Sequence, residues 1–192
     1  MSDDRWQNKY RIESARANWH DYDDGSYFIT ICTKHREHSF GEIDDGNMVL
    51  SDIGNYTAEQ FENVSAHYPD AEIPLYTIMP NHIHAVFIIS TCRDGVHTVS
   101  TTKTDANRWL SDTVNETMQE ISHKKGRLSV VVGGLKRAVT HFSNENDIPF
   151  AWQPRFHDHI IRDNSELNRI ASYIKNNVAN WKDDEFYTPK TA

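Results

Sequence analysis

The chain has 192 residues, 38% hydrophobic and 25% charged, a composition that excludes a chain disordered throughout. Its 20 lysines and arginines against 28 aspartates and glutamates give a formal charge of -8, which taken alone argues against a nucleic-acid binder. No apolar run reaches the roughly 18 residues of a membrane span, and the acidic, polar N-terminus predicts no secretory signal. Cys32 and Cys92 stand in no metal or redox spacing, so we expect reduced thiols in a cytoplasmic protein.

Hydrophobic periodicity and turn residues predict strands and helices that alternate along one domain covering residues 1–192. The predicted strands, in chain order, are 26–33, 48–50, 73–79, 82–90 and 156–162. The predicted helices are 51–66, capped by Ser51, then 135–144, after the pair Gly133-Gly134, and 163–181, which opens with the capping-box pair Asp163 and Glu166. Residues 91–128 are rich in Ser, Thr, Asp and Asn and predict an insertion or a mobile connection. The pattern favours an α+β class, with a sheet covered by helices on one or both faces.

The strand at 82–90 carries two histidines at its beginning. In a strand, residues two apart point to the same side, about 6.6 Å from each other. His82 and His84 therefore share one face with Val86 and Ile88, while Ile83, Ala85, Phe87 and Ile89 fill the other. A strand that is apolar on both faces is typical of a buried, central position. Two imidazoles at the end of such a strand can hold one divalent ion.

The helix at 163–181 carries a tyrosine and an asparagine at the edge of its apolar stripe. Tyr173 and Asn177 are four residues apart and so lie on one face of the helix. A phenol hydroxyl and an amide oxygen therefore project together from the rim of a packed helix.

One segment departs from the acidic character of the chain. Residues 121–144 contain no acidic residue but hold Lys124, Lys125, Arg127, Lys136 and Arg137. Such a segment is either a solvated basic face or a surface that binds phosphate groups.

Met79-Pro80-Asn81-His82-Ile83-His84, followed by an apolar strand, resembles the HUH motif of single-tyrosine transposases. Tyr173-Ile174-x-x-Asn177 resembles their tyrosine helix. From about residue 22 to residue 187, except for 91–128, the sequence resembles REP-associated tyrosine transposases. Further similar positions are Tyr27-Phe28-x-Thr30, Lys136, Trp152-Gln153, Asp158 and Ile161-Arg162.

The resemblance implies a ferredoxin-like HUH fold with a central antiparallel sheet flanked by helices. It implies a metal-dependent endonuclease and strand transferase, acting on single-stranded or hairpin DNA as a monomer or homodimer away from membranes. Tyr173 would attack the scissile phosphate and form a 5′-phosphotyrosine, and His82, His84 and Asn177 would bind Mg²⁺ or Mn²⁺. The expected DNA contacts come from Lys136, Arg137, Lys124, Lys125 and Arg162. His157 and His159, a second H-x-H pair, are expected in a strand beside the site.

Two other functions stay open at this point. A metal-dependent hydrolase of another fold would need further ligands: a cupin, for example, needs a glutamate three or four residues after the second histidine, where Phe87 and Ile88 stand. The other alternative is a domesticated DNA-binding protein that keeps the fold but does not cleave. Covalent attachment to DNA, as opposed to simple binding, would separate the two DNA-directed functions.

Overall fold

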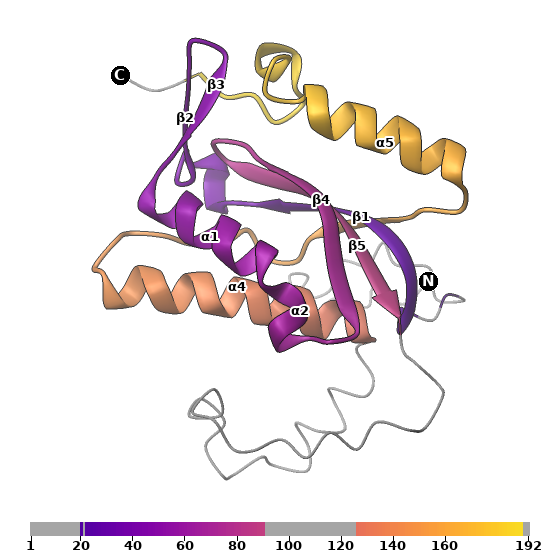
Figure 1. The fold of residues 1–192 in the computed structure, drawn as a ribbon. Helices are drawn as coiled ribbons and strands as arrows, with labels where there is room; N and C mark the ends of the chain where they lie inside the picture. Colours follow the sequence, from indigo (N-terminus) through magenta and orange to yellow (C-terminus); the bar gives the residue numbers. More distant parts are fainter. Residues whose placement is uncertain (1–19, 21, 91–125, 190–192) are drawn as a thin grey trace, which may run out of the picture.

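The structure is a computed structural model that describes residues 20, 22–90 and 126–189 (Figure 1). Its centre is a sheet of four strands: β1 (Asp24–Cys32), β4 (Ala71–Ile78), β5 (His82–Ser90) and β6 (His157–Ile160). The strands lie in the order β4-β5-β1-β6, and each pairs antiparallel with its neighbours. The predicted α+β class with a central antiparallel sheet is therefore confirmed.

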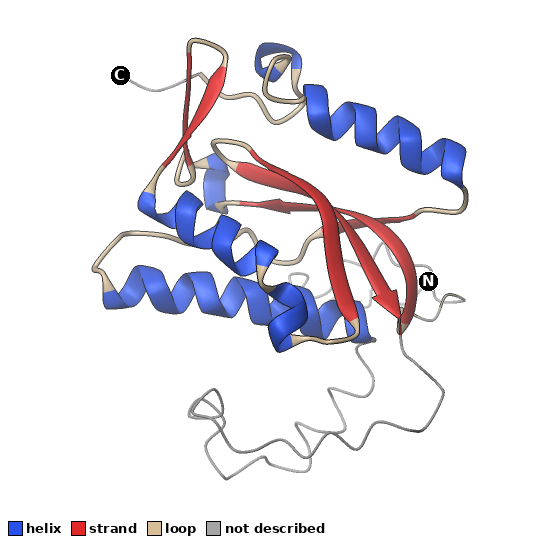
Figure 2. Cartoon of the chain, in the orientation of Figure 1, coloured by secondary structure: helices blue, strands red, loops and turns tan. Residues whose placement is uncertain are grey.

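Helices cover both faces of this sheet (Figures 1 and 2). One face carries α1 (Asp52–Glu62), α2 (Val64–His67) and α4 (Arg127–Glu145), and the other carries α5 (Asn164–Asn176). The main elements follow the order strand, helix, strand, strand, helix, strand, with α5 added at the end. Together with the strand order, this is the ferredoxin-like arrangement.

Smaller elements complete the described part of the chain. A separate hairpin is formed by β2 (Gly41–Asp44) and β3 (Asn47–Leu50), and single 3-10 turns are η2 (Lys34–Arg36) and η4 (Trp181–Asp183). Among the described residues, no helix is long and apolar enough to cross a membrane. Of the predicted insertion at 91–128, residues 91–125 lie outside the described part.

The two faces of the sheet belong to separate apolar clusters. The large cluster lies on the α1 and α4 side and includes Ile83, Ala85, Phe87 and Ile89 of β5. The small cluster joins Val86 of β5 to Ile170 and Ile174 of α5, with partly buried neighbours around them. The predicted two-sided burial of this strand is confirmed.

The helix boundaries depart from the predictions at three places. The helix predicted at 135–144 begins at Arg127, because Leu128, Val131 and Val132 pack into the large cluster. Its glycine pair stays helical because the burial of these three side chains outweighs the weak helix propensity of glycine. The helix predicted at 51–66 is split at Asn63 into α1 and α2, and the one predicted to reach 181 ends at Asn176. The strand predicted at 156–162 is shorter, and β2 was not predicted.

Candidate active site

His82 and His84 lie side by side at the beginning of β5, on the face that α5 covers. Their ring centroids are 4.5 Å apart, and both residues are buried. The register with β1 places Thr30 opposite His84. The spacing that predicted a shared face thus produces adjacent rings in the interior.

Asn81 fixes the orientation of His82. Its amide Nδ2 donates to the Phe186 carbonyl oxygen at 2.9 Å and to Thr188 Oγ1 at 3.1 Å, so its Oδ1 must face the other way. That oxygen lies 2.8 Å from His82 Nδ1 and can only accept, which places the imidazole proton on Nδ1. The lone pair is then on Nε2, which is buried and has no hydrogen-bond partner among the described residues.

His84 is held between a threonine and the tyrosine of α5. Its Nδ1 lies 2.9 Å from Thr30 Oγ1, and its Nε2 lies 3.1 Å from Tyr173 Oη. The ring of Phe28 stacks on the imidazole with centroids 5.3 Å apart. These contacts fix the ring and place Nε2 next to the phenol.

Burial keeps both imidazoles neutral at physiological pH. It lowers the pKa of His82 to about 2, with smaller contributions from His84 and from the positive charge of Arg36. It also lowers the pKa of His84 to about 4, against the opposing effect of Asp184. Neutral imidazoles carry the lone pairs that a metal ion requires.

The beginning of α5 is anchored by a modified capping box. Asp163 Oδ1 accepts a hydrogen bond from the Glu166 backbone N–H at 2.8 Å, as predicted. Glu166 reaches back to the backbone N–H of Arg162 at 3.0 Å instead of that of Asp163. Its second oxygen lies 2.7 Å from His159 Nε2 of β6. The helix is thereby tied to the edge strand, and Ile174 seats it on the sheet.

This docking directs Tyr173 toward the histidines, although its side chain stays 43% exposed. Its hydroxyl lies 3.1 Å from His84 Nε2 and 3.3 Å from Asp184 Oδ2. Burial and the negative charge of Asp184 raise the pKa of the phenol to about 12. The hydroxyl is therefore protonated at neutral pH.

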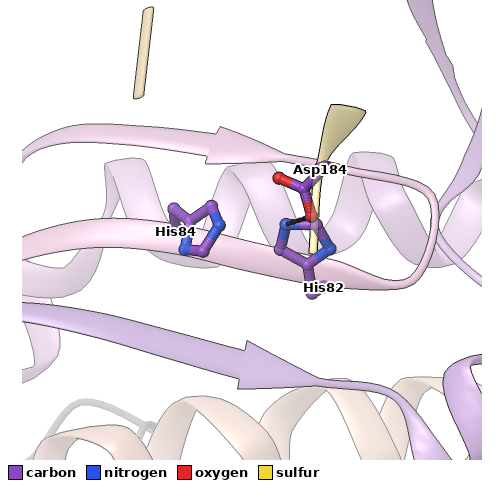
Figure 3. Close-up of side chains that lie close together, drawn as sticks. All are labelled: His82, His84 and Asp184. Atoms are coloured by element: carbon purple, nitrogen blue, oxygen red, sulfur yellow. Dashed lines mark ion pairs between the residues drawn. The ribbon is translucent and has the colours of Figure 1, made fainter. Parts of the chain in front are cut away.

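Asp184 is a member of the site that the sequence patterns did not reveal. It follows η4, and its side chain is 1% exposed. Its Oδ1 lies 3.9 Å from His82 Nε2, and its Oδ2 accepts from Asn177 Nδ2 at 2.7 Å. The donor atoms of His82, His84 and Asp184 all lie within 4.8 Å of one another (Figure 3). Asp184 stands in an acidic run that shows no periodicity. The sequence offered one indication that it belongs to the site, namely that it follows the helix of Tyr173 by only a few residues.

Asn177 lies beside this group, and its amide oxygen accepts no hydrogen bond from the described residues. The residue is buried, and its Oδ1 has no hydrogen-bond partner within the described residues. This oxygen and His82 Nε2 are thus two buried atoms with unused lone pairs, and such atoms could bind a metal ion. A hollow of about 220 Å³ borders the site and is lined by Ser172, Tyr173, Asn176, Asn177, Asn180, Asp183 and Asp184.

The predicted DNA contacts lie in different surroundings. Lys136 donates through Nζ to the carbonyl oxygens of Gln153 and Arg155, at 2.8 and 3.0 Å, so its ammonium group supports that loop. Arg137 and Arg162 are exposed, on α4 and before α5 respectively. Lys124 and Lys125 lie outside the described residues, and His157 is exposed on β6.

Comparison with known proteins finds similar chains both by sequence and by structure. No family model matches the chain. An uncharacterized protein of Haemophilus influenzae is 32% identical over 176 residues, which cover 91% of this chain and 92% of that protein.

Two of the solved structures that resemble this chain are described as transposases. One is a REP-associated tyrosine transposase bound to a REP hairpin, 17% identical with a TM-score of 0.48, covering 90% of this chain and 74% of that one. The other is a Deinococcus radiodurans R1 protein described as a candidate transposase, 11% identical with a TM-score of 0.42, covering 86% and 97%. By its sequence identity over nearly the whole of both chains, the chain belongs to the same family as the uncharacterized Haemophilus influenzae protein.

Proposed function

We propose that this protein is a metal-dependent endonuclease and strand transferase for single-stranded DNA, which forms a 5′-phosphotyrosine link at hairpin DNA. The observation that supports it most is the contact between Tyr173 Oη and His84 Nε2 at 3.1 Å, beside a second buried imidazole with a free lone pair. A nucleophile and a potential cation site thus meet at one point of the sheet.

The donor set fits a divalent cation. His82 and His84 offer neutral nitrogens, and Asn177 offers the orphaned amide oxygen. Mn²⁺ accepts such a mixture of nitrogen and oxygen donors, and Mg²⁺ prefers oxygen and water. A bound cation would polarise a non-bridging oxygen of the scissile phosphate and so increase the electrophilic character of phosphorus.

The residues of the chain perform the transfer. Tyr173 Oη forms a bond to phosphorus in line with the bond that breaks, which joins phosphorus to the 3′ oxygen. The phenol loses its proton to the surrounding water, and the departing 3′ oxygen takes one up, so the charges balance. The phosphotyrosine link conserves the energy of the broken bond, and a 3′ hydroxyl can reverse the step without ATP.

A denaturing gel with labelled hairpin DNAs tests this function. In a cleavage that leaves a 5′-phosphotyrosine, the protein retains a label at the 3′ end of the DNA and releases a label at the 5′ end. We expect an adduct that needs Mn²⁺ or Mg²⁺, disappears with chelator and is absent from Tyr173→Phe. Tyr187→Phe is the matched control, since Tyr187 is also 39% exposed and lies near the site on the C-terminal segment.

Two results would contradict the proposal in different ways. An adduct that persists in Tyr173→Phe would mean that another residue is the nucleophile. Hairpin binding without any adduct, across a broad library and with both cations, would favour the non-cleaving DNA-binding protein instead. The raised pKa of Tyr173 is the observation that favours that alternative, because a protonated phenol is a weak nucleophile.

A further inference from the structure

The site contains a carboxylate that a set of two histidines and an asparagine does not require. His82 and His84 are neutral and Asn177 has no charge, so the donors named so far offer a divalent cation no negative charge. The carboxylate of Asp184 is the anion in the group whose donor atoms lie within 4.8 Å of one another. Divalent cations in proteins are commonly held by at least one carboxylate.

The distance between Asp184 and His82 is too long for a hydrogen bond and is compatible with two ligands of one ion. Oδ1 of Asp184 lies 3.9 Å from His82 Nε2, beyond hydrogen-bond length. Two donors at about 2.1 Å from one ion lie roughly 3 to 4 Å apart, depending on the angle between them. Oδ1 accepts a bond from the Phe186 backbone N–H at 2.7 Å, and a carboxylate oxygen has a second lone pair for an ion.

The other carboxylate oxygen faces the nucleophile. Oδ2 accepts from Asn177 Nδ2 at 2.7 Å and from Tyr173 Oη at 3.3 Å. If His84 Nε2 binds a cation, it can no longer accept from the phenol, and Asp184 is then the acceptor that holds Tyr173. The two oxygens of one side chain thus serve the cation and the nucleophile separately.

The C-terminal segment holds this carboxylate in place. The Phe186 ring lies 4.7 Å from the His82 ring, and the Arg36 guanidinium lies 3.9 Å from the centre of the Phe186 ring. Asn81 holds the Phe186 carbonyl oxygen at 2.9 Å. These contacts position Asp184 over the histidines without any cation.

We propose that Asp184 is a further ligand of the cation and that its second oxygen ties Tyr173 to the cation site. This role rests on the proposed function, since it assumes that His82 and His84 bind a cation. Asp184 is therefore both a ligand and a positioning residue for the nucleophile. The alternative is a purely structural role, in which Asp184 only holds the C-terminal segment through its contacts with Asn177 and Phe186.

Mn²⁺ binding to the full chain tests the ligand role without any reaction. The signal of free Mn²⁺ in electron paramagnetic resonance disappears on binding, so a titration gives the affinity. Asp184→Asn should weaken Mn²⁺ binding by at least about tenfold, and Asp184→Glu, which keeps the carboxylate, should recover much of the loss. Asp183→Asn, an exposed neighbour with the same change of charge, should stay within about twofold of the wild type.

Adduct formation at saturating Mn²⁺ tests the link to Tyr173. Once the cation site is filled, Asp184→Asn should still form adduct at least about tenfold more slowly, because the phenol has lost its anionic acceptor. If Asp184→Asn binds Mn²⁺ as tightly as the wild type, or forms adduct at the same rate or faster, the inference is wrong and Asp184 only covers the site. If neither the wild type nor His84→Ala binds Mn²⁺, the proposed function itself fails at its cation site. Loss of binding in His84→Ala but not in Asp184→Asn would retain the proposed function and reject this inference alone.

Discussion

Replacement of Asn81 by alanine should weaken both the fold and the proposed cation site. Asn81 is buried and makes three short contacts: it accepts from His82 Nδ1 and donates to the Phe186 carbonyl oxygen and Thr188 Oγ1. Each such hydrogen bond contributes about 1 kcal/mol net, and a buried group left without a partner costs about 1 to 3 kcal/mol. His82 Nδ1 and the Phe186 carbonyl oxygen would both be left in that state. We therefore expect Asn81→Ala to lower the free energy of unfolding by about 2 to 5 kcal/mol.

Urea unfolding followed by tryptophan fluorescence measures this loss. With a slope of about 2 kcal/mol per M, the midpoint should fall by roughly 1 to 2.5 M. Mn²⁺ affinity should fall by about 10- to 100-fold, as expected when the partner that orients a ligand histidine is removed. Asn63→Ala is the control, because Asn63 also donates to a carbonyl oxygen, that of Glu59 at 2.9 Å, but is exposed.

The control should lose at most about 1 kcal/mol and no cation affinity. A midpoint for Asn81→Ala within the error of the wild type would refute the claim that the hydrogen bonds of Asn81 stabilise the fold. A destabilised variant with full Mn²⁺ affinity would refute the idea that Asn81 sets the tautomer of His82, while leaving its structural role intact.

Two further predictions concern α4. A Cβ atom on Gly134 would lie 1.8 Å from Tyr68 Oη, whereas one on Gly133 would meet nothing within 4 Å. Gly133→Ala should therefore raise the free energy of unfolding by about 0.5 to 1 kcal/mol and Gly134→Ala should lower it by about 1 to 3 kcal/mol; equal effects in thermal melts would contradict this packing. The second prediction concerns the ion pair between Arg127 and Asp70. Burial would raise the pKa of Asp70, but the hydrogen bond and charge of Arg127 outweigh it and lower the pKa below its ordinary value. The stabilisation should be complete above the unfolded pKa of about 4 and disappear as the pH falls through the lower folded pKa. The stability difference between the wild type and Asp70→Asn should be constant from about pH 5 to 8 and shrink in acid. A difference that grows in acid would contradict the lowered pKa of Asp70.

Local periodicity predicted the parts of the site that lie on regular elements. The alternation in β5 placed His82 and His84 together, and the helical spacing placed Tyr173 of α5 on the same side as Asn177, which directly follows the helix. Both patterns depend on residues two or four apart, and in a strand or a helix this spacing determines which way the side chains point. Their roles in binding a cation and attacking DNA remain predictions.

The parts that the sequence did not predict depend on contacts between distant segments. Asp184 joins the site because the chain after α5 turns back over β5, and the acidic run around it carries no pattern that reports this path. The first turns of α4 were not predicted because they depend on the burial of Leu128, Val131 and Val132 against distant segments, which outweighs the weak helix propensity of the glycine pair. Lys136 was expected at a phosphate, but two backbone carbonyl groups already engage its ammonium group.

The unequal size of the two apolar clusters determines which part of the protein opens first. The cluster under α5 is centred on Val86, Ile170 and Ile174, whereas the other face of the sheet carries the large cluster. Separating α5 from the sheet therefore exposes far less apolar surface than unfolding the whole chain, so amide protons of α5 should exchange with solvent faster than those of β1 and β5. Each such opening moves Tyr173 away from His84. The fraction of time for which Tyr173 lies next to His84 is thus governed by a few apolar side chains and by the contacts that anchor the two ends of the helix.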